Sequence, residues 1–480
     1  MNILLIGGGG REHSIAEALS KSNKINELHC IPGNAGIEKI ARCHNYDISN
    51  QQEILKFCEN NNIDIIFIGP EIPLVEGLAD YLNRNNFFTF GPNQKAAQLE
   101  GSKSFTKDIC KKYNIPTAKY KTFSNAKDAL DYIDNHPIPL VIKVYGLAAG
   151  KGVIIAETKD HAINSVNEIF SGKFGNAGDE IVIEEFLDGE EASFFIISDG
   201  KSFIPLTSAQ DHKRIGDGDT GLNTGGMGAY SPAPIMNKDL EEKTINKIIK
   251  PTIKAMNDYG SPYIGILYAG LMIKNNEPKL IEYNVRFGDP ECQVIIPRLE
   301  NDLVDLLINV KEKSLDNYTL QWKENFAITI VLAAKGYPES YETGDEIKGL
   351  DIIDSIDDVE IFHAGTKTKD NKIVTSGGRV LNINGYGKNL VDAKGSFDQT
   401  EGHAVSFRFD TDGAQKFGRI TSDNTGRRLA VVLDGVVVTA PRINSAITGG
   451  SGIITGNFDA QSAADLAVLL RAGALPAPLE

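Results

Sequence analysis

The stretch VIKVYGLAAGKGV, residues 141–153, decides how the middle of this chain is expected to fold. It is typical of a strand that ends in Lys143, a loop of small residues, and a second strand that begins at Val153. Glycines let a loop approach a ligand closely, and two lysines, Lys143 and Lys151, frame this loop. The pattern favours a loop that covers a polyphosphate over the alternative, a flexible hairpin tip. It is not a Walker A loop, because neither Ser nor Thr follows Lys151.

From Leu140 onward, the segments predict hairpins and therefore an α+β region with antiparallel sheets. The expected strands are Leu140–Val144, Val153–Glu157, Ile181–Phe186, Ala192–Ser198 and Ser202–Ala209. Further on, Ala327–Ala333 and Arg379–Ile383 predict a small β-rich subdomain over residues 326–389.

Before residue 104, short apolar runs alternate with helical patterns. This β-loop-α order predicts a parallel, doubly wound α/β domain over residues 1–103. The expected strands are Asn2–Ile6, Leu28–Ile31, Ile63–Ile68 and Phe87–Phe90, and the helical patterns lie near Leu74–Leu82 and Gln94–Tyr113.

The first glycine loop in chain order, Gly7–Gly10, follows the first expected strand and opens a helix with Arg11, Glu12 and His13. Backbone N–H groups at a helix start attract anions, so the loop is suited to a phosphate. It does not match the dinucleotide fingerprint, whose third glycine would fall on Glu12. A tight strand-to-helix turn without a ligand explains it equally well. His13 is the one histidine that the pattern singles out for testing.

Two later strands carry acids. Glu282 and Asn284 alternate along one strand and therefore point to the same face. Two oxygen donors on one face suit Mg²⁺, whose other ligands phosphate oxygens can supply. Arg286 continues that face and is suited to stabilise charge on a transferring phosphoryl group. Residues 182–187 form an apolar strand that ends in acids, either the edge of an adenine site or a plain sheet strand.

Composition excludes several classes of protein. With 41% hydrophobic and 24% charged residues, the chain is typical of soluble globular proteins, and its 480 residues predict three or four domains. A net charge of −15 offers no basic face for a nucleic acid. Five scattered cysteines indicate a reducing compartment. No leader or apolar stretch of about 18 residues is present, so we expect a cytoplasmic protein without a membrane partner.

The composition changes sharply near residues 387–394. Before residue 394 the chain has 34 Lys and 7 Arg, and from there on it has 2 Lys and 6 Arg. Surface positions accept either cation, so the change indicates two sequence origins. We expect a chimeric chain whose last part begins near residue 390.

The motifs of residues 1–389 together resemble the phosphoribosylamine–glycine ligase family of the ATP-grasp superfamily, in which two α+β subdomains clamp ATP. The motifs that carry the resemblance are Gly7–His13, Gly69–Glu71, Gly101–Lys103, Lys143, Gly146–Val153, Ile183–Leu187, Ser208–Arg214, Thr220–Tyr230, Glu282–Glu291 and Thr375–Leu381. The resemblance implies an ATP-grasp domain over residues 104–325, with its lid at about 120–190.

The resemblance also implies the site residues. ATP would be bound by Lys103, Lys143, Gly146, Gly150, Lys151, Gly152, Glu184, Glu185, Phe186, Leu187 and Glu191. Mg²⁺ or Mn²⁺ would be held by Glu282 and Asn284. Phosphoribosylamine would be contacted by Gly9, Arg11, Asn34, Gly36 and Glu71, and glycine and its activated form by Asp211, Lys213, Arg286, Gly288 and Asp289.

The implied reaction joins glycine to phosphoribosylamine through glycyl phosphate and converts ATP to ADP and phosphate. It needs no nucleophilic side chain, and small molecules are the expected partners of a monomer. One departure lies at the lid, where Val144-Tyr145 replaces the family's Ala-Asp. Alternatives are another ATP-grasp carboxylate–amine ligase, a catalytically impaired fusion, and an export-linked interaction protein, which would need a membrane segment.

Residues 390–480 resemble a different family, the periplasmic segment that precedes the second membrane span in the SecD component of the Sec protein-export translocase. The run Leu466–Leu479 carries much of this resemblance. The pattern predicts an α+β tail with a helix over 413–421 and a hairpin turning at Asp434-Gly435. If the family's closing helix and strand are missing from the ligase part, its β-rich subdomain is expected to expose an apolar face unless the tail covers it.

Overall fold

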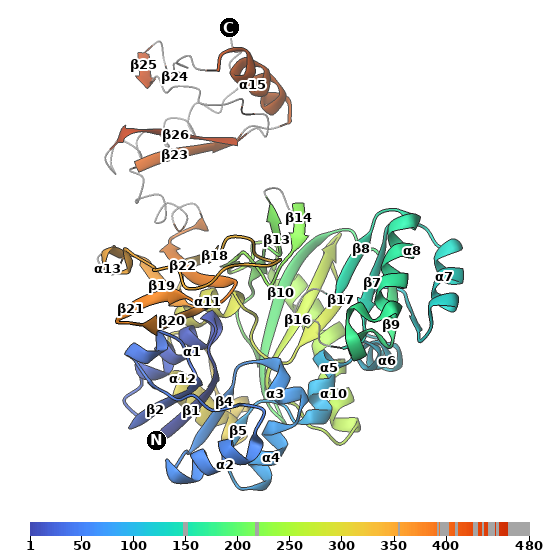
Figure 1. Cartoon of the computed structure of the whole chain (residues 1–480), viewed down its shortest axis with the longest axis vertical. Coiled ribbons are helices and arrows are strands. Elements are labelled where there is room, and N and C mark those ends of the chain that lie inside the picture. The colour runs from blue at the N-terminus through green and yellow to red at the C-terminus, as the bar shows by residue number, and fades with distance from the viewer. Residues whose placement is uncertain are drawn as a thin grey trace. The chain divides into compact units, whose positions relative to one another are not determined.

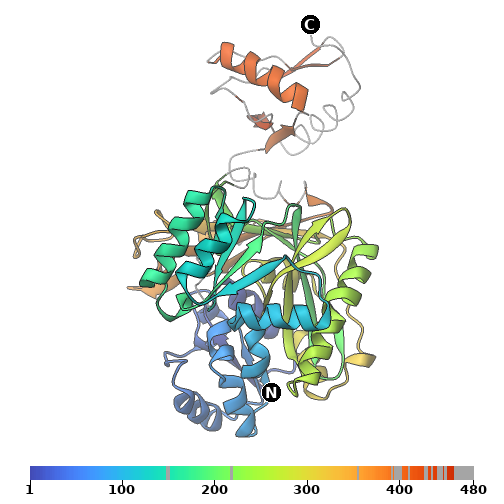
Figure 2. The same ribbon diagram turned by 90° about the vertical axis from the view of Figure 1, so that its right-hand side faces the viewer.

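The computed structural model describes residues 1–146, 152–216, 220–353, 356–390, 393, 403–408, 411–425, 431–433, 436–439, 447 and 451–458. The chain forms two compact units, Met1–Ala393 and Lys394–Glu480, and each is considered by itself (Figures 1 and 2). Among the described helices, none combines the length and the apolar character needed to cross a bilayer.

The first sheet has the strand order β3-β2-β1-β4-β5, and its strands are all parallel, as the β-loop-α order predicts. Its middle strand β1 buries Ile3, Leu4, Leu5 and Ile6 completely, which is typical of a strand covered on both faces. The elements are β1 (Asn2–Gly7), α1 (Gly10–Ser20), β2 (Glu27–Pro32), β3 (Arg42–Cys43), α2 (Gln51–Asn60), β4 (Ile65–Ile68), α3 (Glu71–Val75), α4 (Leu78–Arg84) and β5 (Thr89–Phe90).

The predicted helical pattern Gln94–Tyr113 is two helices, α5 (Gln94–Gly101) and α6 (Lys103–Tyr113). Ser102 separates them because its backbone is extended and its hydroxyl accepts a hydrogen bond from the N–H of Phe105 at 3.1 Å. This cap makes Lys103 the first residue of α6.

The lid region is a four-stranded antiparallel sheet in the order β6-β9-β7-β8. Two helices cover it, and a hydrophobic core of its own includes Phe123, Ile142 and Ile183. The elements are β6 (Tyr120–Phe123), α7 (Ala126–Asp134), β7 (Leu140–Val144), β8 (Val153–Ala156), α8 (Lys159–Glu168) and β9 (Ile181–Glu185).

A second antiparallel sheet, β11-β10-β16-β17, provides the opposite wall of the site. Figure 1 shows β17 beside the lid strands β7 and β9. The elements of this part are β10 (Glu190–Asp199), β11 (Phe203–Pro205), β13 (Arg214–Gly216), β14 (Thr220–Asn223), α9 (Lys238–Thr244), α10 (Lys250–Asp258), β16 (Ile264–Lys274), β17 (Glu277–Asn284), α11 (Glu291–Ile295), η5 (Ile296–Arg298) and α12 (Leu303–Lys311).

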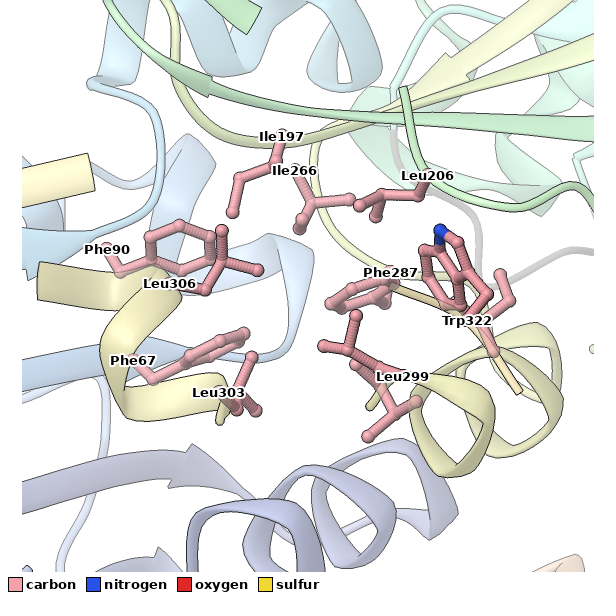
Figure 3. Close-up of a pocket in the computed structure, with 12 residues that line it drawn as sticks. Phe67, Phe90, Ile197, Leu206, Ile266, Phe287, Leu299, Leu303, Leu306 and Trp322 are labelled. Atoms are coloured by element: carbon pink, nitrogen blue, oxygen red, sulfur yellow. The ribbon is translucent and has the colours of Figure 1, made fainter. Parts of the chain in front are cut away.

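The parallel sheet β3-β2-β1-β4-β5 and the antiparallel sheet β11-β10-β16-β17 share one apolar core. A cavity of about 10 Å³ lies at this joint, and every residue that lines it is apolar (Figure 3). That volume is at the lower limit for one water molecule, so the cavity is a packing gap and has no room for a substrate. Its lining includes Phe67, Phe90, Ile197, Ile266, Leu303 and Leu306.

The third sheet has the order β12-β15-β18-β22-β19. On β18, alternate residues are buried, while Ile330 and Leu332 are 39% and 44% exposed. The β18 strand therefore leaves two large apolar side chains exposed on one face of this sheet. The elements are β12 (Gln210–Asp211), β15 (Gly228–Ser231), β18 (Phe326–Ala333), α13 (Leu350–Ile353), β19 (Val359–His363), β20 (Thr366–Lys369), β21 (Lys372–Thr375) and β22 (Arg379–Gly387).

The second unit contains α and β elements, as expected. Strands β23 (His403–Arg408) and β26 (Ser451–Phe458) pair antiparallel, and α15 covers Thr411–Asp423. Strands β24 (Val431–Leu433) and β25 (Val436–Thr439) form the predicted hairpin. The turn residues Asp434 and Gly435 and the run Leu466–Leu479 lie outside the described residues.

Candidate active site

The two walls of the expected clamp meet at β7 and β17. The Lys143 ammonium group donates a hydrogen bond to the carbonyl of Ile281 at 3.0 Å. Beside it, the Lys103 ammonium group lies 3.3 Å from Oε2 of Glu282. The helix start, the lid strand and the acidic strand therefore place their charged groups at one point.

Glu282 is the centre of this charge cluster. Burial raises the pKa of its carboxyl, but the ammonium groups of Lys103, Lys213 and Lys143 outweigh burial and hold the pKa below its usual range. Asn284 lies two residues further along β17, on the same face. One ionised carboxylate and one amide oxygen fit a hard divalent cation that also binds phosphate and water.

Glu184, the last residue but one of β9, pairs its side chain with two lysines. Its carboxylate lies 3.0 Å from the Lys107 ammonium and 3.2 Å from that of Lys143, and all three side chains are buried. This triplet fixes Lys143, and the backbone N–H of the next residue, Glu185, donates to the carbonyl of Lys119 at 2.9 Å. Sequence reasoning missed Lys107, although its position one helical turn after Lys103 could have indicated it.

The lid's described ends are held by backbone contacts. The N–H of Val144 donates to the carbonyl of Gly152 at 2.9 Å, and that of Gly146 donates to Ala177 at 3.5 Å. Tyr145 donates its N–H to Glu180 at 2.9 Å, and its carbonyl accepts from Lys103 at 3.2 Å. All of these bonds join backbone groups, so they do not depend on the side chains of Val144 and Tyr145, the two residues that differ from the family pattern. Gly150 and Lys151 lie outside the described residues.

The strand β9 ends at Glu185, and Phe186 and Leu187 follow it. Glu185 accepts a hydrogen bond from the N–H of Lys119 at 3.1 Å and lies 3.4 Å from the Lys279 ammonium. Phe186 is 40% exposed, and Leu187 is partly buried. An exposed aromatic ring at this point is available to a nucleotide base.

Asp211 is a partly exposed acid, but its carboxyl oxygen Oδ1 is buried and has no hydrogen-bond partner among the described residues. Burial, and then the charge of Glu291, raises the pKa of this carboxyl well above its usual range. Nearby, Lys213 forms an ion pair with Glu191 at 2.9 Å. A desolvated, unpartnered acid of this kind is suited to receive an ammonium group.

Arg286 is partly buried and lies between two acids. Its Nε lies 3.2 Å from Glu71 and its Nη2 lies 3.0 Å from Glu100. Burial raises the pKa of Glu71, but Arg286 and Arg11 outweigh it and lower that pKa to about 2. Arg11 also donates to the carbonyl of Phe287 at 3.1 Å. Glu100 is a further site residue that the sequence did not indicate.

Asp289 connects the first glycine loop to Arg379. A Cβ at Gly9 would lie 3.1 Å from Oδ2 of Asp289, so the loop passes close to this acid. Arg379 lies 3.5 Å from the same oxygen and donates to the Asp289 carbonyl at 2.6 Å. A Cβ at Gly288 would lie 2.1 Å from Glu291. Arg379 lies in a motif of the resemblance but received no role there.

Asn34 and Gly36 lie beside the glycine loop, but Asn34 is occupied by protein backbone. Its amide donates to the carbonyls of Gly8 at 2.9 Å and His363 at 2.8 Å. A Cβ at Gly36 would lie 2.3 Å from the ring of His13. These contacts give both residues a structural reason to be present.

His13 anchors the glycine loop to β19, since its Nδ1 accepts a hydrogen bond from the N–H of His363 at 2.7 Å. Burial, with the charges of His363 and Lys39, lowers the pKa of His13 from 6.5 to about 3. The ring is therefore neutral at physiological pH and is a positioning group.

This low pKa predicts acid sensitivity. The unfolded chain protonates His13 below pH 6.5 and the folded chain does so only near pH 3, so stability falls as pH drops through this window. At pH 5 the loss relative to pH 8 should be about 2 kcal/mol. Denaturant unfolding of wild type and His13→Gln at both pH values measures it. An exposed control, His161→Gln, should keep the wild-type pH dependence, and an unchanged dependence in His13→Gln would contradict the assignment.

Comparison with known proteins agrees with this geometry. The family models for the N domain and the ATP-grasp (A) domain of phosphoribosylglycinamide synthetase match residues 1–100 and 101–292. The phosphoribosylamine–glycine ligase of Brucella melitensis is 51% identical over 394 residues, which cover 82% of this chain and 92% of the relative. The chain belongs to the phosphoribosylamine–glycine ligase family. It is an ATP-dependent ligase of the ATP-grasp fold.

Two further comparisons support the family over the same region. The Agrobacterium fabrum ligase is 50% identical and covers 82% of this chain and 93% of the relative. The crystal structure of the Thermotoga maritima ligase superposes with a TM-score of 0.72 at 34% identity and covers 84% of this chain and 96% of that one. The ligase family therefore accounts for the first unit.

The tail matches a different family. The model of the SecDF P1 head subdomain matches residues 369–477. This confirms the resemblance to the export translocase, although the match begins inside β20, earlier than the sequence predicted. The chain thus joins segments that are similar to two separate families.

Proposed function

We propose that this chain ligates glycine to 5-phosphoribosylamine, giving glycinamide ribonucleotide, ADP and phosphate. The observation that carries the proposal is the meeting of the two walls, where Lys103 reaches Glu282 and Lys143 reaches the adjacent backbone. The family relatives at about 50% identity bear the corresponding name.

In this proposal, ATP phosphates bind between Lys103 and Lys143, and Glu282 with Asn284 would hold Mg²⁺ or Mn²⁺. The metal ion would neutralise negative charge on the phosphates when it is bound. The Glu184 triplet holds Lys143 in place before the nucleotide arrives. Arg286, fixed between Glu71 and Glu100, presents its charge without reorganising, which favours a transition state that develops negative charge.

The glycine carboxylate is a poor electrophile until it is phosphorylated, because an oxide-like oxygen would have to leave. Transfer of the γ-phosphoryl group gives glycyl phosphate, from which phosphate can leave. The amine of phosphoribosylamine then attacks the acyl carbon. Orienting the amine against this intermediate lowers the activation free energy by on the order of 7–11 kcal/mol. The lid excludes water, which would otherwise hydrolyse the acyl phosphate.

We assign the ammonium group of glycine to Asp211, with Glu291 nearby. The unpartnered Oδ1 of Asp211 provides the acceptor, and burial makes an uncompensated charge there costly. The predicted phosphoribosylamine contacts Gly9, Arg11 and Glu71 lie toward Asp289 and Arg286. The two substrates would therefore approach the phosphates from neighbouring parts of one cluster.

Omission of single substrates tests this assignment. Phosphate release should need ATP, a divalent cation, glycine and phosphoribosylamine together, and the product should be glycinamide ribonucleotide by mass spectrometry. Release that persists without glycine, or that another amino acid supports equally, would favour a different carboxylate–amine ligase. Absence of release under all conditions, in a chain that binds ATP, would favour the impaired fusion.

The remaining assignments concern the setting of the enzyme. All five cysteines are free thiols, which is typical of a reducing compartment, so we place the enzyme in the cytoplasm. We propose a monomer with small-molecule substrates. Sedimentation of the full chain tests the oligomeric state.

A further inference from the structure

Two cysteines that belong to none of the ligase motifs lie together at the end of the first sheet. Cys30 on β2 and Cys43 on β3 are register partners in adjacent parallel strands. Neighbouring strands lie about 4.8 Å apart, which is within the Cα separation that a disulfide needs. Gly33 touches both, since a Cβ there would lie 2.3 Å from Sγ of Cys43 and 3.6 Å from Cβ of Cys30.

The two thiols have different surroundings. Cys30 is fully buried, and its Sγ donates to the carbonyl of Gly7 at 3.2 Å, whereas Cys43 is partly exposed. The neighbouring thiol is the largest cause of both shifts: it raises the pKa of Cys30 and lowers the pKa of Cys43. Cys43 is thus the accessible thiol with more thiolate character, and Cys30 is the buried thiol beside it.

We propose that Cys30 and Cys43 form a reversible disulfide, an oxidative modification site at the base of the first glycine loop. Hydrogen peroxide is the oxidant. The Cys43 thiolate attacks a peroxide oxygen, the O–O bond breaks, and Cys43 becomes a sulfenic acid. The hydroxide that leaves takes up the proton that the Cys43 thiol had released and becomes the first water. The Cys30 sulfur then attacks the Cys43 sulfur, the S–O bond breaks, and the Cys30 proton leaves with the second water. Two thiols lose two electrons and two protons in total, and a dithiol reductant reverses the change.

The position of this pair connects it to the substrate site. The Gly7 carbonyl accepts from the Cys30 thiol and from the N–H of Gly33, and the next residue, Asn34, holds the carbonyl of Gly8. Disulfide formation removes the thiol donor and moves Cys43 against Gly33. If the loop binds phosphoribosylamine, as the proposed function has it, oxidation should raise KM for that substrate about fivefold, the equivalent of one hydrogen bond, and change kcat little.

Peptide mapping tests the bond itself and does not depend on the ligase activity. Trypsin cleaves after Lys39 and Arg42, so Cys30 and Cys43 fall in separate peptides, 25–39 and 43–56. After the full chain is treated with hydrogen peroxide and free thiols are alkylated, these two peptides should appear as one species that dithiothreitol separates. The buried cysteines Cys58, Cys110 and Cys292 should stay alkylatable after unfolding. Recovery of both peptides unlinked, or earlier oxidation of another cysteine, would overturn the proposal.

Two variants test the consequence. Cys43→Ser should lose the linked species and keep a KM for phosphoribosylamine that peroxide does not change, while Cys58→Ser should respond like wild type. Cys30→Ser should stop at a sulfenic acid on Cys43, which a dimedone adduct reveals. Thermal unfolding confirms that the variants are folded. If the linked peptides form and the KM for phosphoribosylamine does not change, the disulfide does not affect substrate binding by the loop. If the chain has no ligase activity, the mass of the linked peptides still shows whether the disulfide forms.

Discussion

Replacing Glu282 with glutamine should lower kcat by about 10²–10³-fold, because it removes the only charged protein ligand that we assign to the metal. Three ammonium groups, those of Lys103, Lys213 and Lys143, lower the pKa of this carboxyl against the effect of burial. The variant keeps the shape of the side chain, so the loss reports charge. Steady-state phosphate release at saturating ATP, with the divalent cation varied, measures both kcat and the metal requirement.

A second glutamate on the same strand provides the control. Glu277 is exposed and pairs with Lys243 and Lys247 at the far end of β17. Glu277→Gln should retain wild-type kcat and metal dependence, since exposed ion pairs contribute little. If Glu282→Gln keeps more than a tenth of wild-type kcat and its requirement for the divalent cation is unaltered, the assignment of Glu282 as a metal ligand is wrong.

Replacing Arg286 with methionine should destabilise the fold by about 3 kcal/mol at pH 8, because it leaves Glu71 and Glu100 without their shared cation. Removing only one partner of a largely buried ion pair leaves the other charge uncompensated, and this costs more folding free energy than the intact pair contributes. Glu71 is partly exposed, so we place the estimate at the lower end of the usual range. Chemical denaturation followed by circular dichroism measures the difference in the free energy of unfolding.

The pH dependence distinguishes this cause from lost packing. In wild type, Arg286 and Arg11 lower the pKa of Glu71 to about 2, so its contribution is full above pH 4.5 and is lost as pH falls toward 2. Without Arg286 the two carboxyls can relieve the penalty by taking up protons, so the deficit should shrink between pH 8 and pH 5. The exposed pair Arg42–Glu27 is the control, and Arg42→Met should cost less than about 1 kcal/mol. A deficit that is equal at both pH values would indicate packing alone.

Local patterns predicted most of the fold because strands and helices leave periodic signals. The parallel order of the first sheet, the hairpins after residue 140 and the alternation of Glu282 and Asn284 on β17 all follow from such signals. The break at Ser102 was missed, since an apolar pattern on both sides hides a single extended residue. Boundaries inside the first unit, at residues 103 and 325, remain predictions.

The site was only partly predictable for a physical reason. Motifs name residues that carry a charge at a fixed spacing, but they do not show which buried group neutralises that charge. Lys107 beside Glu184, Glu100 beside Arg286 and Arg379 beside Asp289 come from distant segments. Each is needed because a buried charge without a partner is costly.

The sequence by itself determined the order of strands and helices, the two glycine loops, the strand with Glu282 and Asn284, and the change of composition near residue 394. Each of these features depends only on residues that are close together in the sequence. Only the tertiary structure decided which charges meet, that His13 is a neutral anchor, and that Cys30 and Cys43 face each other. These features depend on strand pairing and burial, and both are set by contacts between segments that no local spacing specifies.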